Sequence, residues 1–210
     1  MKEKKMERNV FEKLKNLEFD GKKLSYYASW ALWNKEDYKN LDYIENNVNL
    51  LNGSIVFVAL NFGGKGPSAN WKDWENIHGE KRVFSLLSGS RYEGAYMTDL
   101  IKNHPNPKAD NLVRNLKKEE IDKNISFFFQ EIDMLGSKEI EMYLFGKEVE
   151  SLFNDYVMQH NDFNTFKQKI KSCQRIDHYG RRNSQFEKKA YIQLGIPKPK
   201  EEAWKYDPLW

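Results

Sequence analysis

A short, nearly continuous apolar run over Ser54–Leu60 constrains the fold of this 210-residue chain more than any other segment. The run reads Ser-Ile-Val-Phe-Val-Ala-Leu, and it lies between Gly53 and the pair Gly63-Gly64. Short apolar runs with turn residues on both sides are typical of strands that are buried on both faces, as in parallel sheets. The segment therefore predicts an α/β fold.

Strands and helices are predicted to alternate along the rest of the chain. The predicted strands are Ser54–Leu60, Gly94–Ile101, Ile140–Phe145 and Ser172–His178, and the predicted helices are Lys81–Leu87, Lys118–Leu135, Lys147–Met158 and Arg181–Leu194. The intervals between the strands allow right-handed crossovers. We therefore expect a three-layer α/β/α sandwich around a central, mainly parallel four-stranded sheet.

We expect residues 1–210 to form a single domain. Residues 1–53 carry apolar side chains at helical spacing, which predicts N-terminal helices that pack on a core of residues 54–194. The residues with this spacing are Phe11, Leu14 and Leu17, then Tyr26, Trp30 and Trp33, then Leu41, Ile44, Val48 and Leu51. Residues 195–210 form a tail rich in proline and tryptophan.

The composition excludes several classes of protein. Lys and Arg number 34 and Asp and Glu 31, so the net charge of +3 excludes a polycation of the histone type. No apolar run reaches the ~20 residues of a membrane span, and Met1–Arg8 has no apolar stretch that would make a secretory signal. A single cysteine, Cys173, excludes a disulfide framework and is predicted to be a small buried residue. We expect a soluble, cytoplasmic protein, with a monomer favoured and no membrane partner.

Unusual residues follow each predicted strand: Asn61, Asp99, Gly146 and His178. Ligands of open α/β sheets bind beyond the carboxyl ends of the strands. Asn61 leads into a glycine-rich loop, whose backbone could approach a ligand or a water closely. Alternatively, Asn61 only turns the chain as the strand ends. Asp99 could likewise bind the amide edge of a base or cap a turn.

His178 is followed by a glycine and by Arg181 and Arg182, an order that could stabilise developing negative charge and hold phosphates. The alternative is a surface histidine beside a solvated basic turn. Trp71 and Trp74 could stack on a nucleobase, or they could cover the edge of the core. The four histidines lack the spacing of metal ligands, so we expect no metal and no other cofactor.

The order of these motifs resembles that of the uracil-DNA glycosylase superfamily, over residues 54–194. Asn61 corresponds to the polar residue that positions the attacking water in this family, and Gly63 to a glycine of the loop that follows. Thr98–Lys102 is similar to the end of the middle strand, and Leu144–Lys147 to the turn before the last crossover. His178 corresponds to the histidine that stabilises the departing base. Within this superfamily, the motifs of the chain are most similar to those of the mismatch-specific and single-strand-selective branches.

This resemblance implies a DNA glycosylase that hydrolyses the N-glycosidic bond of a damaged or deaminated base flipped out of DNA. It implies catalytic roles for Asn61 and His178. It implies base binding by Phe62, Gly63, Trp71, Trp74 and Asp99, and phosphate binding by Lys102, Arg181 and Arg182. The expected partner is DNA, bound with an affinity that falls as salt rises.

The chain also departs from the family pattern. Ala59 replaces the first glycine of the loop, Phe62 replaces its proline, and Tyr179-Gly180 replaces Pro-Ser after the histidine. Asp99 replaces a base-reading asparagine, and an ionised carboxylate accepts hydrogen bonds but cannot donate them. Two alternatives therefore stay open: a non-catalytic protein that binds nucleic acid or a nucleotide, and a hydrolase of free nucleosides or nucleotides.

Overall fold

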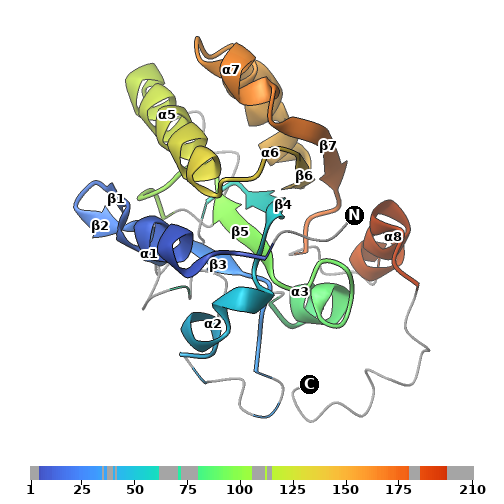
Figure 1. Ribbon diagram of the computed structural model, residues 1–210. Helices are drawn as coiled ribbons and strands as arrows, with labels where there is room; N and C mark the ends of the chain where they lie inside the picture. The colour runs from blue at the N-terminus through green and yellow to red at the C-terminus, as the bar shows by residue number, and fades with distance from the viewer. Residues whose placement is uncertain are drawn as a thin grey trace.

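The computed structural model describes residues 5–34, 36, 40, 42–61, 71, 80–105, 112, 115–179 and 185–197. Its centre is a five-stranded sheet with the strand order β3-β5-β4-β6-β7 (Figure 1). The strands are β3 (Ala28–Trp30), β4 (Asn52–Ala59), β5 (Ala95–Asp99), β6 (Ile140–Phe145) and β7 (Ile170–Ile176). All neighbouring pairs are parallel except β3 and β5, which are antiparallel. The protein therefore has an α/β fold with a mostly parallel sheet.

Side chains of the central strand β4 alternate between two apolar clusters, one on each face of the sheet. Val56 and Val58 belong to the cluster that includes helix α5 (Lys118–Met134). Ile55 and Phe57 belong to the cluster that includes helix α8 (Gln185–Leu194). We call these two sides the α5 face and the α8 face. Because both faces of β4 are covered, the strand reads as a continuous apolar run.

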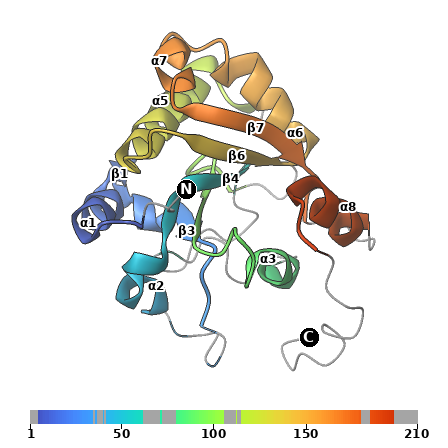
Figure 2. The ribbon, with the colours of Figure 1, turned by 45° about the vertical axis from the view of Figure 1, so that its right-hand side comes forward.

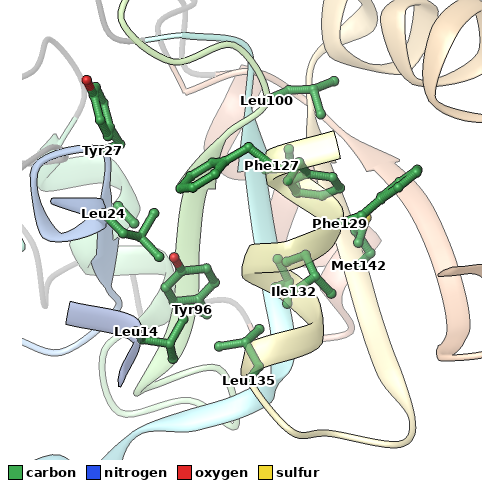
Figure 3. Close-up of a cluster of buried hydrophobic side chains, with 14 of the residues drawn as sticks. Leu14, Leu24, Tyr27, Tyr96, Leu100, Phe127, Phe129, Ile132, Leu135 and Met142 are labelled. Carbon is green, nitrogen blue, oxygen red and sulfur yellow. The ribbon is translucent and has the colours of Figure 1, made fainter. Parts of the chain in front are cut away.

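Helices flank the sheet on both faces (Figure 2). The α5 face also packs against α1 (Arg8–Asn16), α2 (Tyr43–Asn46), α6 (Lys147–Leu152), the π-helix η3 (Phe153–Val157) and α7 (Phe163–Lys167), and the α8 face against α3 (Glu80–Leu87). Figure 3 shows side chains of α5, among them Phe127 and Ile132, in one cluster with Tyr96 of β5 and Leu14 of α1. A small hairpin, β1 (Glu18–Phe19) and β2 (Lys22–Lys23), lies outside the main sheet.

All four predicted strands are present, but the prediction of a four-stranded sheet was wrong because β3 adds a fifth strand. The helix predicted from Tyr26, Trp30 and Trp33 is instead a 3₁₀ turn, η1 (Leu24–Tyr26), followed by β3. Trp30 packs on Tyr96 on the α5 face, whereas Trp33 packs on Phe84 on the α8 face. Pairing with β5 decides the local structure here, since helical packing would put both tryptophans on one side.

Two other predicted helices lie at the predicted positions but differ from the prediction in length or type. The helix expected from Leu41 to Leu51 is two short pieces, α2 and the 3₁₀ turn η2 (Val48–Leu50), within the described residues. The helix expected over 147–158 changes to a π-helix at Phe153.

Cys173 is exposed, not buried as predicted, because β7 is an edge strand of the sheet. Among the described residues, no helix combines the length and the apolar character that crossing a bilayer requires.

We predict that Phe57→Ala lowers the free energy of unfolding by about 3–5 kcal/mol, because it leaves a large cavity in the core. The Phe57 ring is fully buried and stacks on Tyr143 and Phe145, with centroid distances of 5.1 and 5.5 Å. Urea denaturation measures the change. Ile192→Ala is the control, since Ile192 is 81% exposed and its loss is expected to change stability by less than about 0.5 kcal/mol. Equal losses in the two variants would contradict the packing described above.

Candidate functional site

The site is placed by the position of β4 between β5 and β6. From β4 the chain crosses to β5 on one side, and it then returns past β4 to β6 on the other side. Such a reversal of direction opens a crevice at the carboxyl ends of the strands, where open α/β sheets bind their ligands. Asn61 lies at this point, two residues after the end of β4. We call the ends of β4–β7, where Asn61, Gly146 and His178 lie, the carboxyl edge.

The side chain of Asn61 is half-buried and held in a defined orientation. Its Nδ2 donates a hydrogen bond of 2.9 Å to the backbone carbonyl of His104. The ladder between β4 and β5 continues up to this point, because Leu100 N–H donates to the Ala59 carbonyl and Ile101 N–H to the Leu60 carbonyl, both at 2.8 Å. Since Nδ2 is turned toward His104, the carboxamide oxygen of Asn61 faces away from that carbonyl.

His178 lies at the end of β7, next to the turn that follows β6. A Cβ atom placed on Gly146 would lie 3.1 Å from the Cβ atom of His178, and Gly146 has φ +92°. The imidazole ring stacks on Tyr179, with centroids 4.4 Å apart, and Tyr179 in turn packs edge-on against Phe145. The missing side chain of Gly146 thus makes room for the half-buried His178.

The separation between Asn61 and His178 follows from the order of the strands. Only β6 lies between β4 and β7. Neighbouring strands are about 4.8 Å apart, so the axes of β4 and β7 are about 10 Å apart.

Asp99 and Lys102 lie beneath the carboxyl edge and not on its surface. Asp99 is 2% exposed, and Lys102 is completely buried. Lys102 Nζ lies 2.7 Å from Glu131 Oε2, donates to the Asp99 carbonyl at 2.7 Å and is within 6 Å of the rings of Phe127 and Phe128. A fully buried ammonium group cannot reach a DNA phosphate in this arrangement. The phosphate-binding role implied for Lys102 therefore does not agree with its position.

Trp71 belongs to the core. Its side chain is 1% exposed, and its ring lies 5.3 Å from the ring of Phe11 and 6.1 Å from that of Trp30, both on the α5 face. Its carbonyl accepts a 2.6 Å hydrogen bond from Ser29 Oγ of β3. Of the two roles considered for Trp71, the structure agrees with a core residue, because a ring covered in this way cannot stack on a base.

Five predicted site residues lie outside the described residues: Phe62, Gly63, Trp74, Arg181 and Arg182. Of the predicted set, the structure thus brings Asn61 and His178 to one edge and places Asp99 below it. His104, Asn124 and Glu131 were not predicted, although they form the polar surroundings of this edge. Asn124 and Glu131 had a signal in the sequence: they are polar residues seven positions apart on the apolar side of a helix, with Phe128 between them.

A second group of polar side chains, on the α5 face, has the residue types of a catalytic triad. Ser126 Oγ lies 3.1 Å from His160 Nε2, and Asp162 Oδ2 lies 3.7 Å from His160 Nδ1. However, the backbone N–H of Asp162 donates to Nδ1, which places the imidazole proton on Nε2. A histidine in this tautomer donates to Ser126 and cannot take its proton, so the group does not activate a nucleophile.

A cavity of about 500 Å³ lies far from the carboxyl edge. Its lining includes Ser90, Arg91, Tyr92 and Leu194, and Tyr92 is close to the beginning of β5, opposite to Asp99. Arg91 hydrogen-bonds Glu141 and Tyr143. Burial raises the pKa of Glu141, but hydrogen bonds from Arg91, Lys171 and Tyr143 outweigh this effect and lower it. The basic group of this cavity is thus already neutralised by an acidic partner.

Comparison with known proteins adds no family to this description. No protein-family model matches the chain, and no curated protein matches it. Within the part of the chain that the structure describes, no three His, Cys, Asp or Glu side chains are grouped so that they could hold a metal ion. The geometry of the carboxyl edge is therefore the basis for a functional hypothesis.

We predict that Gly146→Ala displaces His178 and lowers the free energy of unfolding by about 1–3 kcal/mol more than Gly136→Ala does, because the added methyl group overpacks the turn. Both glycines have positive φ, +92° and +69°, but a Cβ atom on Gly136 would meet nothing within 4 Å. Thermal and urea denaturation of the two variants measure the difference. If the two alanine variants were equally stable, the close approach of Gly146 to His178 would be wrong.

We predict a pH-dependent effect of Glu141→Gln. Because the pKa of Glu141 is lowered in the folded protein, its carboxylate stabilises the fold at pH values above its unfolded pKa of about 4.3, and this contribution is lost as the pH falls through the folded pKa. The variant should be less stable than the parent by about 1 kcal/mol or more at pH 7, and this gap should be smaller at about pH 3, because the contribution is lost as the pH falls through the lowered folded pKa. Urea denaturation at both pH values measures it, with the exposed Glu139→Gln as control. A gap that is the same at both pH values would contradict the prediction.

Proposed function

We propose that the chain is a DNA glycosylase of the uracil-DNA glycosylase type, built as a three-layer α/β/α sandwich. It hydrolyses the N-glycosidic bond of a damaged or deaminated base that is flipped out of DNA, and it thereby acts in base-excision repair. The observation that carries this proposal is the orientation of Asn61 at the point where the strand order reverses.

The hydrogen bond from Asn61 Nδ2 to the His104 carbonyl supports a role in positioning water. With its amide nitrogen engaged there, the carboxamide oxygen is the group that can accept a hydrogen bond from a water held below C1′ of the sugar. The oxygen of this water bonds to C1′ as the bond from C1′ to the base nitrogen breaks. The base leaves with the bonding electron pair, and a proton of the water neutralises it in the end.

His178 supports the other half of the reaction. Its imidazole is on the far side of the ~10 Å interval between β4 and β7, and its N–H donates to the base oxygen where negative charge develops. Such a preorganised donor lowers the barrier, because it is already in place where the negative charge develops. The reaction needs no metal and no organic cofactor, since water is the nucleophile and the base anion is the leaving group.

The burial of Lys102 and Trp71 changes which residues are proposed to bind DNA. Phosphate binding is proposed for Arg181 and Arg182, and stacking on the base for Phe62 and Trp74. Asp99 is buried as well, so contact with the base is not proposed for it in this arrangement. Gly63 is proposed to let the loop approach the base closely.

We predict that the protein releases a base from one of a panel of labelled oligonucleotides containing uracil, hypoxanthine, xanthine or a T·G mismatch, in single and double strands. Alkali converts the resulting abasic sites into strand breaks, which a denaturing gel resolves. Asn61→Ala should lower the rate at least 100-fold, since the attacking water loses its anchor, and should leave DNA binding within a factor of two.

The control is Asn16→Ala, because Asn16 is an exposed residue at the end of α1, and this variant should keep full activity. Cleavage by the parent and by Asn61→Ala at equal rates would contradict the role of Asn61. If a folded protein shifts DNA or binds nucleotides but cleaves none of the substrates, the enzyme proposal is wrong and the carboxyl edge is a recognition site.

A further inference from the structure

The ion pair between Lys102 and Glu131 is the most unusual feature outside the two proposed catalytic residues. Both side chains are completely buried, and their charged atoms are 2.7 Å apart. The remaining polar atoms are also engaged: Tyr96 donates to Glu131 Oε1 at 2.6 Å, and Lys102 Nζ donates to the Asp99 carbonyl. A buried pair of this kind contributes little net stability, since two apolar side chains of similar volume would stabilise the core as well or better. Its position in the fold suggests a different role.

Lys102 is tied to α5 at both ends. Its backbone N–H donates to Asn124 Oδ1 at 2.7 Å, and its side chain folds back to Glu131, two helical turns further along α5. On the way, Nζ binds the carbonyl of Asp99 and thereby closes the turn that follows β5. Residues 99–102 are therefore fixed on the long helix by one side chain and its own backbone.

The same turn continues directly to the carbonyl that holds Asn61. Asn103 adopts a left-handed conformation with φ +59°, and His104 then presents its carbonyl oxygen to Asn61 Nδ2. Asn103 is thus the one residue between Lys102, which carries the buried ammonium group, and His104, whose carbonyl orients the carboxamide. The His104 carbonyl and the Lys102 tethers therefore belong to one short stretch of backbone.

We propose that Lys102, held by Glu131 and Asn124, is a positioning residue that sets the orientation of the Asn61 carboxamide through the backbone of residues 99–104. The catalytic consequence of this proposal rests on the proposed function. Its structural consequence does not, because the orientation of Asn61 can be observed without any substrate.

The test is the double variant Lys102→Met with Glu131→Gln, which removes both buried charges together and keeps an oxygen that accepts from Tyr96. The side-chain amide signals of Asn61 in a ¹H–¹⁵N correlation spectrum, identified by their loss in Asn61→Ala, report the hydrogen bond to His104. We expect these signals to move or broaden in the double variant while the circular dichroism spectrum stays that of the parent. If the parent protein cleaves DNA, the kcat of the double variant should be at least tenfold lower than that of the parent, and its KM should stay within a factor of two.

The matched control is Asp133→Asn with Lys169→Met. This change removes an ion pair that also joins α5 to the rest of the fold, but on the surface and away from the turn. It should leave the Asn61 signals and any activity as they are in the parent. Asn124→Ala is the second test variant, since it removes the other tether of Lys102 without creating an unpaired charge. It should move the Asn61 signals as well, and it decides the question if the double variant does not fold.

Asn61 signals that stay unchanged in a folded double variant, or in Asn124→Ala, would overturn the proposal. So would signals that move equally in the surface control, because the effect would then be general. If the signals move as expected but the parent cleaves no DNA, the proposed function fails and the positioning role stands. If the signals move and the activity of an active parent is unchanged, the catalytic part of the proposal is wrong.

Discussion

The covering of β4 on both faces is the constraint from which the rest of this structure follows. A strand with apolar side chains on both sides must lie inside a sheet, with helices on each face. The crossovers from β4 to β5 and from β5 to β6 then run in opposite directions, since they lead to opposite sides of β4. The strand ends separate at this point, and the first polar residue after β4, Asn61, lies where they separate.

The long helix α5 has two functions in this fold. Its apolar residues, such as Phe128 and Ile132, fill the α5 face of the core. Its polar residues Asn124 and Glu131 lie on the same buried side and hold the turn after β5. Removing one partner of a buried ion pair costs about 3–5 kcal/mol. The fold therefore depends on Glu131 and Lys102 being present together, although the pair adds little to stability when it is intact.

The sheet was largely predictable from the sequence, and the surroundings of the candidate site were not. Strands such as Ile140–Phe145 are predictable from local apolar runs between turn residues, and the end of α5 is predictable from Gly136. Trp30, the last residue of β3, and Trp33, which follows the strand, misled the prediction, because aromatic residues three positions apart fit a helix and also fit a segment that is buried on both faces of a sheet. Lys102 misled it for a related reason: lysine is almost always exposed, and only the position of Glu131 on a distant helix permits its burial.

The amino-acid sequence alone determined the class of the fold, the order of the strands from β4 onward and the placing of Asn61 and His178 after strands, because these features depend on local patterns of apolar and turn residues. The tertiary structure decided which of the predicted site residues lie close together and which are buried. Asn61 acquires its orientation from the His104 carbonyl, 43 positions away, and Lys102 its burial from Glu131. Contacts of this kind arise only when strands and helices pack, since the free energy of a buried charge depends on the partner that the fold brings to it.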